Sequence, residues 1–408
     1  MDTIKNFLFW ILAILLIGGV VGSISAFFLV SLDFVTTTRE NQFIWVLLLP
    51  LGGLLIGYTY YYLEKGVEGG NNHLIKEMIV PERKIHWKMT PLVLFGTLAT
   101  HLFGGSAGRE GTAVQMGGAT ADQLSLRWKS SENQRKTILR MGVAAGFASI
   151  FGTPMAGIAF AYELGRDKRF HIRGILPILL ASFLGDFVCH AWQVEHTHYT
   201  IAEIPTFTLA NLGWTLLAGL IFGGAAYLFS ILKVFFTKQF QRLVKFPPFR
   251  PFIGGIVIVL VVLLINDTKY LGLGVPYIES SFTDGAASYD FIVKLLFTAF
   301  TLGAGYKGGE ATPLFFIGAT LGSVLIWFIP LPISLLAGLG FIAVFAGATN
   351  TPIACIIMGI ELFGGEATPY YMIVCVLAFV ISGNTSVYAE QQKILRKYSL
   401  IKRKNKLL

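Results

Sequence analysis

A run of 26 residues near the N-terminus, residues 7–32, contains no Asp, Glu, Lys or Arg. A helix needs about 20 apolar residues to cross the hydrocarbon core of a bilayer, so this run predicts a transmembrane helix. A cleaved signal peptide has a shorter apolar stretch and a small-residue cleavage site, so we expect this segment to be retained. Only 13% of the 408 residues are charged, whereas soluble domains average about 25%. These features exclude a water-soluble fold and predict an all-α integral membrane protein.

The net charge of +9 lies in short basic clusters beside apolar segments. The clusters occupy residues 83–88, 127–136, 166–173, 238–250 and 393–406. Cytoplasmic loops of membrane proteins are enriched in Lys and Arg, so the clusters predict cytoplasmic loops and a cytoplasmic C-terminus. Because the charge is not gathered on one polar domain, we do not expect nucleic acid as a partner.

No Ser- or Pro-rich linker divides the chain. We therefore expect one membrane domain over residues 1–408, without a cytoplasmic regulatory domain. Cys189, Cys355 and Cys375 lie in or beside apolar segments and show no ligand-like spacing, so we expect them to be buried small residues.

Two parts of the sequence occur twice, about 200 residues apart. The matching segments are GREGT at 108–112 with GGEAT at 308–312, and residues 142–164 with residues 340–362. A repeat inside a membrane protein indicates a transporter or channel whose site lies between the repeats. The similarity is equally compatible with parallel and inverted repeats. We place the repeats at about 40–235 and 250–392.

Gly, Pro, Ser and Thr residues interrupt the apolar runs in both repeats. The interruptions fall at 104–112, 152–157, 302–313 and 347–352. They predict helices that end at membrane depth, which is tolerated only where the ends are buried in protein or line a wet cavity.

Four charged residues stand out in this apolar background: Arg109, Glu110, Lys307 and Glu310. A charge at the bilayer centre costs about 3 kcal/mol, so these residues are functional candidates. Both glutamates sit at glycine-rich turns that open an apolar helix, where free N–H groups favour an anion. Glu110 could instead cap its own helix beside Arg109. The two interpretations are compatible, because protonation or a competing anion can displace a carboxylate from helix N-termini.

The segment GREGTAVQ at 108–115 resembles the GREGP-x-VQ motif of the CLC family of chloride channels and chloride/proton exchangers. Further segments that resemble this family, in its order, lie at 152–160, 309–313 and 384–388, so the likeness extends from about Gly69 to Tyr388. The resemblance implies a CLC-type fold of two inverted-topology repeats with many tilted and partial-span helices. It also implies a homodimer in the lipid bilayer, in which each subunit holds its own pathway.

Three departures from the usual CLC motifs point to one branch of the family. Thr112 replaces a proline, Ala311 replaces a phenylalanine, and residues 69–75 replace the first anion-site motif. This pattern is similar to the fluoride-exporting branch. It implies export of fluoride in exchange for protons across a bacterial cytoplasmic membrane, which gives fluoride resistance. The alternative is a chloride/proton antiporter or a chloride channel of the same family.

The resemblance also implies roles for single residues. Glu110 matches the gating, proton-coupled glutamate, Tyr388 the anion-coordinating tyrosine, and Glu310 a glutamate characteristic of the fluoride branch. The full set of predicted anion-binding residues is Asn71, Gly108, Arg109, Gly111, Glu310, Ala311, Thr312 and Tyr388. The inner proton glutamate of chloride/proton exchangers falls at Leu164, which cannot ionise. Proton coupling must therefore use Glu110, with Glu310 as a second candidate. Fluoride is small and accepts strong hydrogen bonds, so dense N–H, amide and hydroxyl donors favour it.

Three further features concern residues outside this set. His190, Glu195, His196 and His198 form a cluster of potential zinc ligands, which would fit a membrane metalloenzyme. No H-E-x-x-H pattern accompanies them, so we favour a solvated loop and predict no metal, no cofactor and no enzymatic activity. Glu163 and Glu361 occupy equivalent places in the repeats, and we expect both to cap helices or bind backbone groups. His73 and Lys307 flank the site and are candidates for drawing anions inward.

Overall fold

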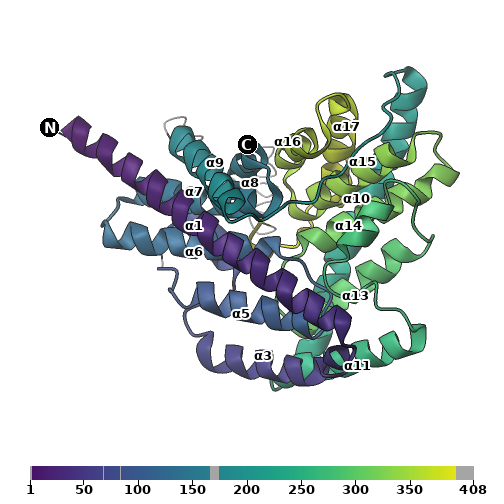
Figure 1. Cartoon of the computed structure of the whole chain (residues 1–408), viewed down its shortest axis with the longest axis horizontal. Coiled ribbons are helices and arrows are strands. Elements are labelled where there is room, and N and C mark those ends of the chain that lie inside the picture. Colours follow the sequence, from purple (N-terminus) through teal and green to yellow (C-terminus); the bar gives the residue numbers. More distant parts are fainter. Residues whose placement is uncertain (1, 68, 83, 166–173, 392–408) are drawn as a thin grey trace, which may run out of the picture.

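The computed structural model describes residues 2–67, 69–82, 84–165 and 174–391 (Figure 1). These residues form helices and no strand. In chain order the helices are α1 (Asp2–Asn41), α2 (Ile44–Leu47), α3 (Leu49–Leu63), α4 (Asn71–Ile79), α5 (Met89–Leu102), α6 (Glu110–Arg127), α7 (Glu132–Phe151), α8 (Pro154–Gly165), α9 (Ile175–Ala191), α10 (Leu209–Leu243), α11 (Phe249–Ile265), α12 (Val275–Ser280), α13 (Asp290–Ala304), α14 (Ala311–Val324), α15 (Ile333–Thr349), α16 (Pro352–Phe363) and α17 (Thr368–Ser382). The basic clusters at 166–173 and 393–406, and the predicted cytoplasmic C-terminus, lie outside the described residues.

Two helices are long and apolar enough to cross a membrane alone. They are α1, over residues 4–41, and α10. The predicted transmembrane run 7–32 lies within α1. Most other apolar helices have 10–17 residues, which confirms the prediction of partial-span helices. The three cysteines are buried, as predicted.

Helices α7 and α15 end in the same way. Their C-caps are Gly152 and Asn350, which have φ values of +68° and +57°. Left-handed residues at these positions stop a helix, and proline two residues later is well placed to begin the next one. Pro154 and Pro352 are accordingly the first residues of α8 and α16. The predicted interruptions at 152–157 and 347–352 are therefore real helix breaks.

The later helices repeat the packing of the early ones. In Figure 1 the early helices lie mostly on the left and the later ones on the right. Helix α6 packs against α7 as α14 packs against α15, and α1 packs against α9 as α10 packs against α17. The two long helices thus hold equivalent places. We infer that the repeats comprise α1–α9 and α10–α17, and therefore start earlier than the boundaries of 40–235 and 250–392 that the motifs indicated.

Glu163 and Glu361 connect the two repeats reciprocally. The Glu361 carboxylate accepts hydrogen bonds from the backbone N–H groups of Met155 and Ala156, both at 2.8 Å, at the start of α8. The Glu163 carboxylate accepts the equivalent bonds at the start of α16, from Ile353 at 3.1 Å and Ala354 at 2.7 Å. The predicted capping role is confirmed, and each glutamate caps a helix of the other repeat.

Replacing either Glu163 or Glu361 by Gln should lower stability by a similar amount. The amide keeps one acceptor oxygen and loses the charge, so the free energy of unfolding should fall by about 2 kcal/mol in each variant. Thermal unfolding of the purified proteins in detergent measures the effect, with the exposed Glu366→Gln as control. An unchanged midpoint in both variants would show that these bonds do not stabilise the fold.

Candidate functional site

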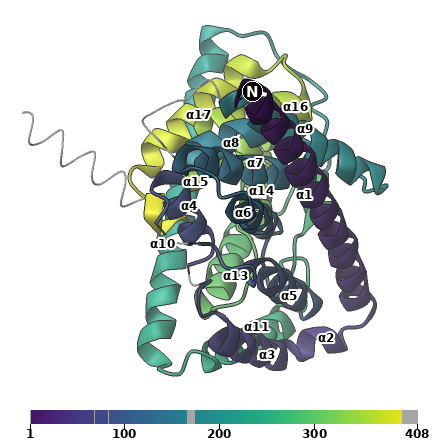
Figure 2. The same ribbon diagram turned by 90° about the vertical axis from the view of Figure 1, so that its left-hand side faces the viewer.

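The N-termini of α6 and α14 meet near the middle of the molecule, where Figure 2 shows both helices surrounded by others. Gly108 and Gly309 precede these helices and exchange two backbone hydrogen bonds, each of 2.7 Å. A Cβ atom on Gly309 would lie 2.7 Å from the backbone nitrogen of Gly111. Only glycine permits this approach, so the two glycine-rich turns are what bring the helix starts together.

Glu110 is buried between the two helix starts, with 3% of its surface exposed. Its carboxylate accepts hydrogen bonds from the Thr312 backbone N–H at 3.1 Å, from the Thr312 hydroxyl, and from the Arg109 backbone N–H at 3.1 Å. The carboxylate therefore lies at the N-terminus of α14, which belongs to the other repeat. Backbone N–H groups and the positive end of the helix dipole make this a place for an anion.

A cavity of about 260 Å³ adjoins this point. Residues that line it include Asn71, Thr97, Thr112, Gln115, Lys233, Lys307, Glu310 and Tyr388. Three predicted anion-binding side chains, those of Asn71, Glu310 and Tyr388, are thus brought together. The Asn71 amide nitrogen lies near Gly111, 3.1 Å from where a Cβ on that glycine would be. The amide is therefore a hydrogen-bond donor directed toward the start of α6.

Salt bridges hold the short helix that carries Asn71. Helix α4 follows a turn in which Gly70 has φ +50°, a conformation that favours glycine. Glu77 of this helix binds Arg135 of α7 at 3.1 Å, and Arg135 also binds Asp122 of α6 at 2.6 and 3.0 Å. Because Glu77 and Asp122 are buried, these charge-assisted bonds fix α4, and with it Asn71, against α6 and α7.

Lys233 is a site residue that the sequence analysis missed. This lysine on α10 forms an ion pair with Glu310 and donates to the Val387 carbonyl at 3.1 Å. It is the only charged residue between 209 and 237, a signal that could have identified it. Lys307 lines the same cavity, with its ammonium 4.1 Å from the centroid of the Tyr60 ring.

Arg109 lies apart from the other predicted anion-binding side chains. It lines a second cavity, of about 780 Å³, together with residues 193–195 and Lys269. Glu110 lines neither cavity, whereas its neighbours Arg109 and Thr112 line one each. The structure therefore does not bring the side chains of Arg109 and Asn71 into one cavity, and the anion-binding role of Arg109 stays a prediction. Glu110 thus lies in the chain between a residue that lines the larger cavity and one that lines the smaller.

His73, the other predicted flanking residue, does not line either cavity. Its ring lies 3.8 Å from the Glu77 carboxylate, on the same helix. The remaining predicted residues are buried and stand at the two helix starts. They are Gly108 and Gly111 at α6, and Ala311 and Thr312 at α14.

The sequence profile of the voltage-gated chloride channel family matches residues 52–383. The chain belongs to this family, the CLC family. This CLC protein is 43% identical to a chloride/fluoride channel protein of Pseudomonas syringae pv. tomato, over 94% of the chain and 86% of that relative. It is 25% identical to an H(+)/Cl(-) exchange transporter, ClcA, of Vibrio campbellii, over 88% of the chain and 82% of that relative.

Solved CLC structures share the fold of this chain. A CLC-type fluoride/proton antiporter matches with a TM-score of 0.90 and 36% identity, over 93% of this chain and 96% of the other. The predicted CLC fold of inverted repeats is confirmed, and the protein is a multi-pass membrane protein. These relatives are named as channels, transporters and antiporters rather than enzymes.

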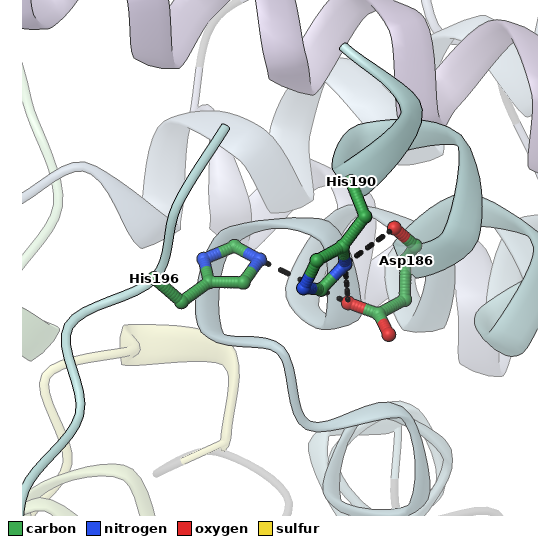
Figure 3. Close-up of side chains that lie close together, drawn as sticks. All are labelled: Asp186, His190 and His196. Atoms are coloured by element: carbon green, nitrogen blue, oxygen red, sulfur yellow. Dashed lines mark hydrogen bonds and ion pairs between the residues drawn. The ribbon is translucent and has the colours of Figure 1, made fainter. Parts of the chain in front are cut away.

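The histidine cluster of this CLC protein differs from the predicted one. His190 and His196 lie beside Asp186, which the sequence analysis did not include (Figure 3). Glu195 lines the larger cavity instead, and His198 is exposed. The side chain of His196 is only 7% exposed, so the prediction of a solvated loop is wrong for this residue.

Proposed function

We propose that this CLC protein exports fluoride in exchange for protons, and that Glu110 both blocks the pathway and carries the proton. One observation supports this assignment most strongly: the buried Glu110 carboxylate occupies the helix start of α14, and its neighbours Arg109 and Thr112 line different cavities. The relatives support the choice of ion, since one is named a chloride/fluoride channel protein and another a fluoride/proton antiporter.

The geometry suggests how protons and anions are coupled. The ionised carboxylate of Glu110 accepts the hydrogen bonds of Thr312 that would otherwise be available to an anion. Protonation removes the charge and weakens these bonds, which frees the helix start. An anion can then bind there, and its departure lets the deprotonated carboxylate return. In each cycle Glu110 therefore takes up and releases one proton, and anions pass while it is protonated.

The surrounding groups favour a strongly hydrogen-bonding anion. Thr312 offers a backbone N–H and a hydroxyl, and the Asn71 amide and the Tyr388 side chain adjoin the smaller cavity. Fluoride holds its water tightly, so replacing that water requires several donors at close range. We also propose a homodimer in a bacterial cytoplasmic membrane with a cytoplasmic C-terminus, which the family resemblance and the basic clusters support.

Purified protein in liposomes tests the function directly. We expect fluoride efflux that is faster than chloride efflux, with protons moving in the opposite direction, and neither movement in protein-free liposomes. A fluoride electrode, a chloride electrode and a pH electrode record the three fluxes in parallel. Chloride efflux as fast as fluoride efflux would favour the chloride/proton antiporter, and fluoride efflux without linked proton movement would identify a channel.

A further inference from the structure

Three side chains outside the anion pathway converge where α9 ends (Figure 3). Asp186 and His190 lie four residues apart on one face of α9, and His196 comes from the segment that follows the helix. The Asp186 carboxylate oxygen is 3.5 Å from His190 Nδ1 and 3.9 Å from His196 Nε2. One donor atom from each residue lies within 4.8 Å of the other two.

Two of these donor atoms are buried without a hydrogen bond. Neither His196 Nε2 nor Asp186 Oδ1 has a hydrogen-bond partner among the residues that the structure describes. The other nitrogen of the His196 ring is oriented by a backbone hydrogen bond to Ile150. This geometry leaves Nε2 as the His196 ring nitrogen that is available to a ligand. Leaving such atoms unsatisfied destabilises the fold, and a bound cation would satisfy both.

We propose that Asp186, His190 and His196 bind a divalent transition metal of the zinc class, and that the bound metal slows ion passage. Two imidazoles and one carboxylate are a ligand set that zinc accepts, with water in the fourth position. Zinc–ligand bonds of about 2.1 Å put the donors of a tetrahedral site roughly 3.4 Å apart. The carboxylate–imidazole separations of 3.5 and 3.9 Å are near this value, and all three donors lie within 4.8 Å of one another, so binding requires the three side chains to close around the ion. Calcium and magnesium prefer sites made entirely of oxygen ligands.

The position of His196 links this site to the ion pathway. Its neighbours Gln193, Val194, Glu195 and Thr197 line the larger cavity together with Arg109. His196 itself packs on Gly152, where an added Cβ would lie 2.9 Å from the imidazole ring. A metal bound by His196 and the two ligands on α9 would tether this segment to the helix. The wall of the cavity next to Arg109 would then be fixed, which should slow the movement of ions and of the Glu110 region.

Zinc binding can be measured without transport. Purified full-length protein, stripped with a chelator and then freed of it, is titrated with zinc sulfate against a fluorescent zinc indicator. We expect one zinc ion per chain. Zinc affinity should fall by at least about tenfold in His190→Ala, which removes a ligand, and in Asp186→Asn, which removes its charge. Even replacing residues that only support the metal ligands lowers affinity by this factor. His198→Ala is the matched control, because this exposed histidine belongs to the same segment, and it should bind zinc as the wild type does.

Fluoride efflux from liposomes tests the effect on transport. Zinc should slow efflux by the wild type and by His198→Ala, and should have no effect on His190→Ala. Equal zinc affinity in the wild type, His190→Ala and Asp186→Asn would overturn the site. Full binding with unchanged efflux would overturn the effect on transport. The site and the proposed function fail separately: a protein that binds zinc but moves no fluoride contradicts only the function, and one that moves fluoride but binds no zinc contradicts only the site.

Discussion

Glu110→Gln is expected to reduce proton-coupled fluoride exchange severely. The amide preserves the size of the side chain and can still accept a bond from Thr312, but it cannot take up and release a proton at physiological pH. Coupled flux should therefore fall on the order of 100-fold, the range found when an essential proton-transfer group is removed. Simultaneous fluoride and pH recordings on proteoliposomes measure this loss.

The matched control for this variant is Glu366→Gln. Glu366 lies in the exposed turn before α17, so this replacement removes a carboxylate of the same kind without touching the site. Its coupled flux should equal that of the wild type. Wild-type exchange by Glu110→Gln would show that protons pass through another group, and Glu310 would be the first to test.

Replacing Lys233 by Met should damage the protein more than replacing Lys233 and Glu310 together. The side chains of this ion pair are 21% and 10% exposed, and removing one partner leaves the other charge poorly compensated. The free energy of unfolding should fall by about 3 kcal/mol in Lys233→Met. The double variant Lys233→Met/Glu310→Gln should recover most of that loss. Thermal unfolding in detergent measures the stability of the wild type, of Lys233→Met, of Glu310→Gln and of the double variant.

The double-mutant comparison distinguishes a coupled pair from two independent charges. If the losses of Lys233→Met and Glu310→Gln simply add in the double variant, the ion pair does not stabilise the site. Lys238→Met provides the control, because Lys238 is an exposed lysine on the same helix. Fluoride efflux by the stable double variant then shows whether the charge pair is required for transport or only for folding.

Local sequence signals predicted much of the fold. Glycine, proline and threonine marked the breaks at 152–157 and 347–352 because these residues act on the neighbouring backbone. The equivalent positions of Glu163 and Glu361 likewise indicated a capping role. The repeat boundaries inferred from packing differ from those placed by motif, because α1 and α10 share length and apolar character but no motif.

The site itself depends on contacts that no local signal encodes. The sequence placed Glu110 at a helix start, but its hydrogen bonds to Thr312 depend on the bridge that joins Gly108 to Gly309. Lys233 reaches Glu310 from a separate helix, and no short motif relates the two residues. Arg109 and Asn71 were grouped by motif, but they line different cavities because neighbouring residues at a helix start can point in different directions.

The reciprocal capping of α8 and α16 has a consequence for how such a protein could have arisen. A half-length ancestor with the glutamate now found at positions 163 and 361 could not have satisfied the start of its own short helix in this way. It could have done so by pairing with a second copy inserted upside down in the bilayer. Gene fusion would then have preserved a contact that two separate, oppositely oriented chains already made.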